Sequence, residues 1–187
     1  GVAGGVCRAT AGLQQPFGDQ RVLDTPLDET TIAGLTVGLA TQGMKPVAEA
    51  QFDGFMYPMV DHIVCHAARF RYRTRGRLTC PMVLRVPWGG GIRAPEHHSE
   101  ANEAIFTNVP GLRVVMPSSP QRAYGLLLAA IREGRRLPLG CDLAVAFDEK
   151  ADLVFHRRQS LPLHANGMRF TAFGDAGQAL EERVYYS

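Results

Sequence analysis

Apolar residues along the chain fall into short compact runs and into longer stretches with helical spacing. The segments 45–52, 81–86 and 112–117 are expected to be strands. The last two are compact apolar runs, which are typical of strands buried on both faces of a parallel sheet. Amphipathic segments separate the strands. Strands that alternate with helices predict an α/β domain in which helices flank a parallel sheet.

The first helix is expected between Pro26 and Gly43. Ile32, Leu35 and Leu39 recur at near-helical spacing. Pro26 is expected in the first turn, where its missing N–H has no intrahelical partner to lose. Gly43 is a suitable residue for the end of this helix.

Three further helices are predicted downstream. A long helix is expected over residues 55–73, with Pro58 in its first turn, and a short one over residues 102–106. The segment 119–133 has a clear amphipathic pattern, with Ser119 as the expected cap residue and a proline directly after it.

The pattern weakens after residue 133. Residues 1–133 are therefore expected to form one domain, and residues 134–187 an unassigned tail with one strand over Leu143 to Phe147. The rest of the tail is expected to be partly disordered or an irregular appendage. The chain begins at Gly1 without a signal-peptide pattern, which indicates a processed or truncated start.

Composition narrows the class of protein. The chain has 187 residues, of which 45% are hydrophobic, and this suits one main globular domain. A net charge of +2 is too small to indicate nucleic-acid binding. The four cysteines form no CxxC pair, which argues against a zinc ribbon or a disulfide framework. Reduced cysteines and the absence of an apolar run of ~20 residues favour a cytoplasmic protein.

Three segments are candidates for chemistry, because ligands of open parallel sheets bind at the carboxyl ends of the strands. They are the segment around Glu29, the aromatic segment 52–57 and the loop 88–99. Glu29 is either a simple helix-start acid or a partly buried acid whose shifted pKa serves proton transfer. The aromatic residues Phe52, Phe55 and Tyr57 form either core or a stacking wall for a flat heteroaromatic ligand.

Histidines are the other candidate ligands. The loop 88–99 contains three successive glycines, which allow close approach of a ligand, followed by His97 and His98. Adjacent residues point in different directions and are poor joint metal ligands. His62 and His66 are four residues apart on the expected helix and could share a metal. Without an evident third ligand, a solvated or capping role is favoured for this pair.

An alternating arginine run follows the long helix. It could bind RNA or phosphate, or it could complement the end of a helix and continue as a solvated turn. The near-neutral net charge and the absence of a stacking motif favour the second interpretation. The run consists of Arg69, Arg71, Arg73, Arg75 and Arg77.

Taken together and in order, these segments resemble one family. The resemblance covers residues 4–132 and rests on TPLDETTIAG, KPVAEAQFDGFMYPMVDHIV, PMVLRVPWGGGIRAPEHHSE and PGLRVVMPSSPQRAYGLLLAAIR. They are similar to the beta subunit of the decarboxylating component of branched-chain 2-oxoacid and pyruvate dehydrogenases. The resemblance implies a transketolase-like, pyrimidine-binding domain.

The family implies a cofactor and partners. The cofactor would be thiamine diphosphate, with its aminopyrimidine in the beta subunit and its diphosphate and magnesium held mainly by an alpha subunit. Two alpha and two beta subunits are expected, together with a lipoyl acyltransferase core that receives the acyl group. The reaction would be oxidative decarboxylation of a 2-oxoacid, with a branched-chain substrate as the first expectation and pyruvate as the second. The isolated chain is expected to be inactive.

The resemblance also implies roles for three residues. Glu29 would hydrogen-bond a pyrimidine ring nitrogen and stabilise the imino tautomer that takes the thiazolium proton. Phe55 would pack on the pyrimidine ring. His98 would act as acid or base when the acyl group passes to the lipoyl arm, for which imidazole is well suited. The three residues are expected on one rim of the sheet.

The chain departs from the family pattern at both ends. The resemblance implies a first strand before residue 4 and a second domain after residue 132, so the domain is expected to be truncated at both ends. Thr31 stands where the family has a small residue and is expected to crowd the start of the helix. The alternative to an enzyme subunit is a non-catalytic fragment that keeps the pyrimidine-binding fold.

Overall fold

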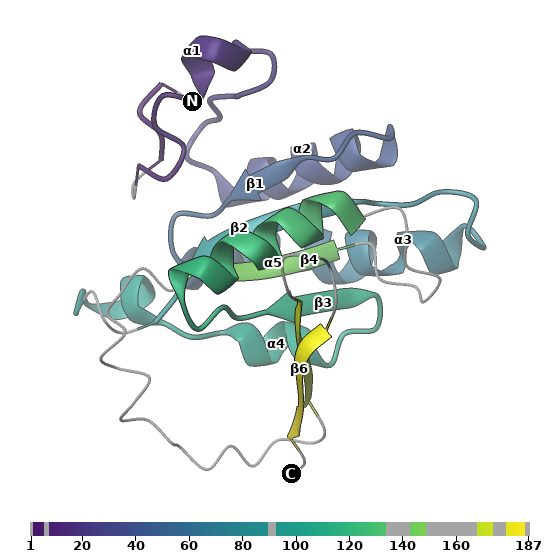
Figure 1. The fold of residues 1–187 in the computed structure, drawn as a ribbon. Coiled ribbons are helices and arrows are strands. Elements are labelled where there is room, and N and C mark those ends of the chain that lie inside the picture. Colours follow the sequence, from purple (N-terminus) through teal and green to yellow (C-terminus); the bar gives the residue numbers. More distant parts are fainter. Residues whose placement is uncertain are drawn as a thin grey trace.

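Four parallel strands form the central sheet of the protein (Figure 1). The computed structural model describes residues 2–5, 8–89, 93–133, 143–148, 168–173 and 179–185. The strands, in the spatial order β1-β2-β4-β3, are β1 (Val47–Glu49), β2 (Met82–Pro87), β4 (Leu143–Asp148) and β3 (Leu112–Val115). The three strands expected over 45–52, 81–86 and 112–117, and the parallel α/β class, are confirmed.

Strand β2 is buried along its whole length, as its apolar run predicts. Val83 pairs with Val47 of β1 on one side, and Leu84 pairs with Val145 of β4 on the other. Arg85 is the one charged residue of β2. Its guanidinium lies 2.8 Å from the Glu49 carboxylate of the neighbouring strand, so that this buried charge is paired.

The strand predicted over Leu143 to Phe147 is present as β4, and it lies inside the sheet. It is hydrogen-bonded between β2 and β3. The sequence analysis ended the domain at residue 133 and so left β4 outside it. The pairing of β4 with β2 and β3 makes this strand part of the sheet. Later in the chain, β5 (Met168–Phe173) and β6 (Ala179–Tyr185) pair as a separate antiparallel hairpin, which extends below the sheet in Figure 1.

Helix α2 (Glu29–Thr41) begins later than the sequence pattern indicates. Asp28 caps it by accepting a hydrogen bond from the backbone N–H of Thr30, so that Pro26 lies before the helix and not in its first turn. The Thr31 hydroxyl donates to the Asp28 carboxylate at 2.5 Å. Thr31 therefore stabilises the helix start through its hydroxyl, and the expected crowding stays a prediction.

The single long helix expected over 55–73 is instead three helical segments of different hydrogen-bond spacing. They are the 3₁₀-helix η1 (Asp53–Met59), the π-helix η2 (Asp61–Ala67) and the α-helix α3 (Ala68–Arg73). Pro58 lies inside η1 and not in a first α-helical turn. Proline lacks the N–H of a regular i to i−4 bond and its ring clashes with the carbonyl four residues before, which disfavours an uninterrupted α-helix there.

Three expected features near the third strand are confirmed. A short helix, α4 (Glu103–Thr107), precedes β3, and a long one, α5 (Pro120–Glu133), follows it. The Ser119 hydroxyl accepts a hydrogen bond from the Arg122 N–H at 3.2 Å, which is the expected N-cap.

Among the described helices, none combines the length and the apolar character needed to cross a membrane.

The core lies mainly on one face of the sheet. Met82, Leu84 and Val86 occupy alternate positions of β2 and belong to one buried cluster with residues of α2, η1, η2 and α4. Helix α5 lies across the front of the sheet in Figure 1 and buries Leu126. The segment with α1 (Gln14–Phe17) projects away from the sheet.

The arginine run lies at the end of α3 and in the turn after it. The Arg73 guanidinium donates to the Cys65 carbonyl at 2.7 Å, and the Arg77 guanidinium donates to the Thr74 carbonyl at 3.2 Å. The Arg77 contact lies at the end of α3, as the helix-end interpretation of the run predicts, whereas the Arg73 contact is with a carbonyl inside η2.

Candidate functional site

The segments that follow β1 and β2 meet at one edge of the sheet. Strand β1 leads into η1, and β2 leads through a loop into the short 3₁₀-helix η4 (Glu96–Ser99). Neighbouring parallel strands end at the same edge, and η1 contacts η4 there. Helix α2 also contacts η1. Two of the glycines of the loop, Gly90 and Gly91, lie outside the described residues.

The aromatic segment and the histidine pair form one cluster of rings. The His98 ring lies edge-on to Phe52 and to Phe55, with ring centroids 4.8 Å and 5.2 Å away. His97 stacks on Phe55, with centroids 5.9 Å apart and ring planes within 7°. The structure therefore brings Phe55 and His98 together, although 43 residues separate them in the sequence.

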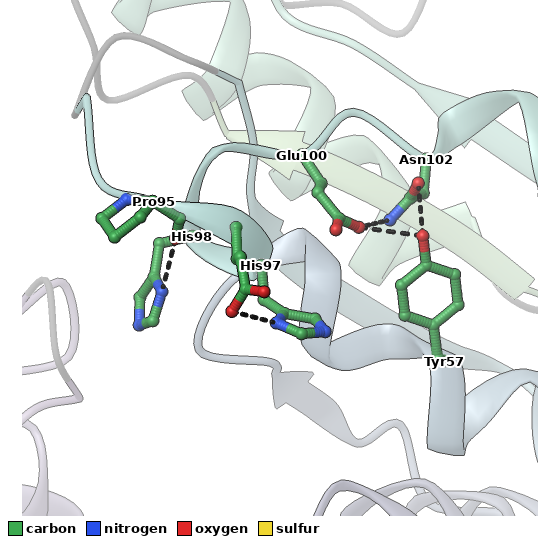
Figure 2. A network of polar contacts seen from close by, with 7 residues as sticks. Tyr57, Pro95, His97, His98, Glu100 and Asn102 are labelled. Carbon is green, nitrogen blue, oxygen red and sulfur yellow. Dashed lines mark hydrogen bonds and ion pairs between the residues drawn. The ribbon is translucent and has the colours of Figure 1, made fainter.

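One nitrogen of His98 has a defined neighbour. Nδ1 lies 3.3 Å from the Pro95 carbonyl oxygen (Figure 2). A carbonyl only accepts, so a proton on Nδ1 suits this contact and makes Nε2 the nitrogen able to accept a proton. The arrangement can therefore orient an imidazole for proton transfer.

A close backbone contact holds η4 against η1. A Cβ atom at Gly54 would overlap the backbone of His97. Gly54 is buried, and it lies next to Phe55 in η1. The absence of a side chain at Gly54 is thus what allows the histidine segment to reach the aromatic rings. The sequence analysis missed this residue, because a lone glycine between an expected strand and an expected helix carries little signal.

Asp53 makes a second link between the two segments, and it too was missed. Its side chain is 1% exposed, and its Oδ2 accepts a hydrogen bond from the backbone N–H of Asn102. Oδ1 is buried and has no hydrogen-bond partner among the described residues. The only signal in the sequence was an acid directly after a strand and the first aromatic residue.

Burial dominates the electrostatics of Asp53. The pKa of the carboxyl is raised from 3.8 to about 6, and burial is the largest cause. The hydrogen bond from Asn102 opposes this rise, and the negative charges of Glu103 and Glu100 add to it. Asp53 is therefore poised to change its protonation in the mildly acidic range.

A polar network ties the same loop to η1 at a third point (Figure 2). The Tyr57 hydroxyl lies 2.9 Å from the Glu100 carboxylate and 3.1 Å from the Asn102 side-chain oxygen, and it can donate to either. The Asn102 amide also donates to Glu100 at 2.9 Å. The donors of Asn102 and Tyr57 hold the pKa of Glu100 below its usual value, and the Glu100 carboxylate raises the pKa of Tyr57.

Glu29 is the first residue of α2, the helix that contacts η1. Its side chain is partly exposed. None of the hydrogen bonds seen in the described residues joins it to Phe55 or His98. The structure thus joins two of the three predicted site residues by direct contact, and the role of Glu29 stays a prediction.

The titration of Asp53 gives a testable pH dependence of stability. The pKa is higher in the folded protein than its ordinary value, so the folded state binds this proton more tightly than the unfolded chain does. The contribution stabilises the fold fully below about pH 4 and is lost as the pH rises through about 6. Asp53→Asn removes the titration and keeps an oxygen for the Asn102 N–H.

We expect the free energy of unfolding of the wild type, taken relative to Asp53→Asn, to fall between about pH 4 and pH 7. The fall is at most about 3 kcal/mol, from 1.36 kcal/mol per unit of pKa. Urea unfolding of both proteins across this range measures it. Parallel pH profiles of the two proteins would contradict the assignment.

Comparison with known proteins extends this picture. Residues 1–140 match the pyrimidine-binding domain of transketolase. The chain is 59% identical to a pyruvate dehydrogenase E1 component subunit beta of Acholeplasma laidlawii. The match extends over 133 residues, which make up 71% of this chain and 41% of that protein. It is 52% identical over 133 residues to a 2-oxoisovalerate dehydrogenase subunit beta of Bacillus subtilis, and this match again covers 71% of this chain and 41% of that protein.

A longer match is found with the pyruvate dehydrogenase E1 component subunit beta of Bacillus subtilis. It is 50% identical over 162 residues, which is 87% of this chain and 47% of that protein. The chain thus spans less than half the length of each of these relatives. The match over residues 1–140, together with the parallel sheet, shows that the chain belongs to the family of transketolase-type pyrimidine-binding domains, and its resemblance to the beta subunits of 2-oxoacid dehydrogenase E1 components is confirmed.

Proposed function

We propose that the chain provides the aminopyrimidine-binding part of a thiamine-diphosphate-dependent 2-oxoacid dehydrogenase E1 component, as its beta subunit. The observation that carries the proposal is the contact of Phe55 with His98 at the edge of the sheet where β1 and β2 end. An aromatic face next to an imidazole fits a flat heteroaromatic ring and a group that exchanges protons. The names of the relatives agree with this chemistry.

The three predicted site residues have distinct parts in the proposal. Phe55 packs on the pyrimidine ring, and its half-buried position leaves part of the ring accessible. The Glu29 carboxyl hydrogen-bonds a pyrimidine nitrogen, from the first turn of α2. His98 holds and returns a proton at Nε2 during acyl transfer, while the Pro95 carbonyl orients its ring. When bound, the cofactor supplies the carbon that attacks the 2-oxoacid.

The complete enzyme needs other chains. In the proposal, an alpha subunit holds the diphosphate and magnesium, two alpha and two beta subunits assemble, and a lipoyl acyltransferase core receives the acyl group. The substrate is a 2-oxoacid. Pyruvate and 2-oxoisovalerate both occur in the names of similar beta subunits, so a branched-chain 2-oxoacid and pyruvate are the two substrates to compare. The cytoplasm is the proposed location.

The proposal predicts a strong dependence on the alpha subunit. A ring stack and a few hydrogen bonds do not offset the cost of immobilising a ligand, whereas diphosphate and magnesium contacts add charge-assisted bonds. We expect the isolated 187-residue chain to bind thiamine diphosphate weakly and to show no decarboxylase activity. Calorimetric titration, with and without a cognate alpha subunit and magnesium, measures the difference.

Two outcomes would count against this prediction. Tight cofactor binding by the isolated chain would show that the pyrimidine pocket does not depend on a partner. Failure of the cofactor to bind when the alpha subunit and a full-length beta subunit carrying this domain are assembled would favour the non-catalytic alternative. Replacing Phe55 by Ala in that assembly should weaken cofactor binding, since it removes the proposed stacking face.

A further inference from the structure

Three side chains with metal-binding atoms lie together on the π-helix η2. They are Asp61, His62 and His66, and one ligand atom of each lies within 4.8 Å of the other two. His66 Nε2 is 3.5 Å from the Asp61 carboxylate. The rings of His62 and His66 have centroids 5.8 Å apart. The candidate cofactor site uses none of these residues.

The wide turn of the π-helix creates this cluster. In an α-helix, residues four apart share a face, which pairs His62 with His66. Residues five apart do not share it, so Asp61 would point elsewhere. The π-helix forms its hydrogen bonds between residues five apart, and this brings Asp61 over His66. The third ligand that the sequence pattern lacked is therefore supplied by the backbone geometry.

Helix α2 helps to hold one of the ligands. The His62 ring lies against Gly34, where a Cβ atom would be 3.4 Å from Cε1 and 3.5 Å from Nε2. His62 is thus partly buried and positioned by a neighbouring element. The other two side chains remain accessible to ions, since Asp61 is 70% exposed and His66 is 45% exposed.

We propose that Asp61, His62 and His66 bind a divalent transition-metal ion of the zinc class. Two imidazoles and one carboxylate form a ligand set that zinc accepts, and three protein ligands leave a fourth position for water. Magnesium and calcium prefer oxygen ligands throughout, so the two imidazoles select against them. The ion would connect both ends of the π-turn, and the carboxylate would offset part of its charge.

Zinc binding to the full 187-residue chain tests the proposal. Competition with a chromogenic chelator gives the dissociation constant, and the absorption of bound Co²⁺ reports the coordination. We expect each of Asp61→Asn, His62→Gln and His66→Gln to weaken zinc binding by about tenfold or more, since loss of one of three ligands removes a coordinate bond. His97→Gln is the matched control, because it removes a surface histidine from a different segment, and it should keep the wild-type affinity.

The ion should also stabilise the fold. A ligand that binds only the folded state raises the melting temperature with its concentration. We expect zinc to raise the melting temperature of the wild type and of His97→Gln, and to raise that of His62→Gln much less. Circular dichroism shows whether each variant keeps the fold, which is expected because Asp61 and His66 are at the surface.

Three results would overturn the proposal. The first is equal zinc affinity in the wild type and in folded variants of all three residues. The second is loss of affinity in His97→Gln as large as in His66→Gln. The third is displacement of zinc by a modest excess of magnesium, which would indicate an oxygen-only site.

Discussion

Glu29→Gln should abolish proton exchange at the thiazolium carbon when this domain works within a complete E1 component. A glutamine amide cannot share the proton that a carboxyl group holds against the pyrimidine nitrogen. General acid–base groups typically contribute about 10²–10⁴-fold to a rate, so the exchange rate should fall by at least this factor. Deuterium exchange, measured in a full-length beta subunit assembled with its alpha subunit, reports the step directly.

Two further variants make this result specific. Asp28→Asn changes a carboxylate to an amide one residue away, and it should leave the exchange unchanged because asparagine also caps helices well. His98→Ala should spare more of the exchange and should slow acyl transfer to the lipoyl group in single-turnover measurements. Unchanged exchange in Glu29→Gln would remove Glu29 from the proposed chemistry.

Gly54→Ala should displace the histidine segment from the aromatic rings. The added Cβ would overlap the backbone of His97, and backbone cannot turn aside as a flexible side chain can. Overpacking of this kind typically costs about 1–3 kcal/mol. We expect a loss of this size in the free energy of unfolding, measured by urea denaturation, and a loss of the nuclear Overhauser contacts between the Phe55 and His98 rings.

Gly38→Ala is the matched control for this substitution. Gly38 lies in α2, and a Cβ atom there would meet nothing within 4 Å. The same change should therefore stabilise the helix, by roughly 0.5–1 kcal/mol. Equal effects of the two substitutions would show that Gly54 is not a point of close approach, and the contact between η1 and η4 would need another explanation.

The segments of the candidate site could be recognised in the sequence, whereas the contacts between them could not. The aromatic segment and the histidine pair were both recognisable as candidates, because each follows a predicted strand. Their contact depends on Gly54 and Asp53, whose importance arises only when η4 packs on η1. Glu29 has a clear place at the start of α2, but the chemistry assigned to it rests on the family resemblance and awaits the exchange experiment.

The sequence by itself determined the parallel α/β class, the three expected strands and the cap of α5. Each depends on residues within a few positions of one another: the buried run of β2, or Ser119 with the N–H three residues later. Such local patterns have fixed periods, so they can be recognised without knowledge of the rest of the chain. The resemblance to the E1 beta subunits was recognisable for a similar reason, because its motifs are continuous in the sequence.

Only the tertiary structure decided the remaining features. The position of β4 between β2 and β3 depends on hydrogen bonds between segments far apart in the chain. The raised pKa of Asp53 depends on burial by a loop that comes some fifty residues later, bonded through Asn102. The cluster of Asp61 with His66 depends on a π-turn inside a segment that reads as an ordinary α-helix. The first two features depend on contacts between segments far apart in the chain, and the third depends on a change in helical hydrogen-bond spacing. A periodic pattern of apolar residues shows none of them.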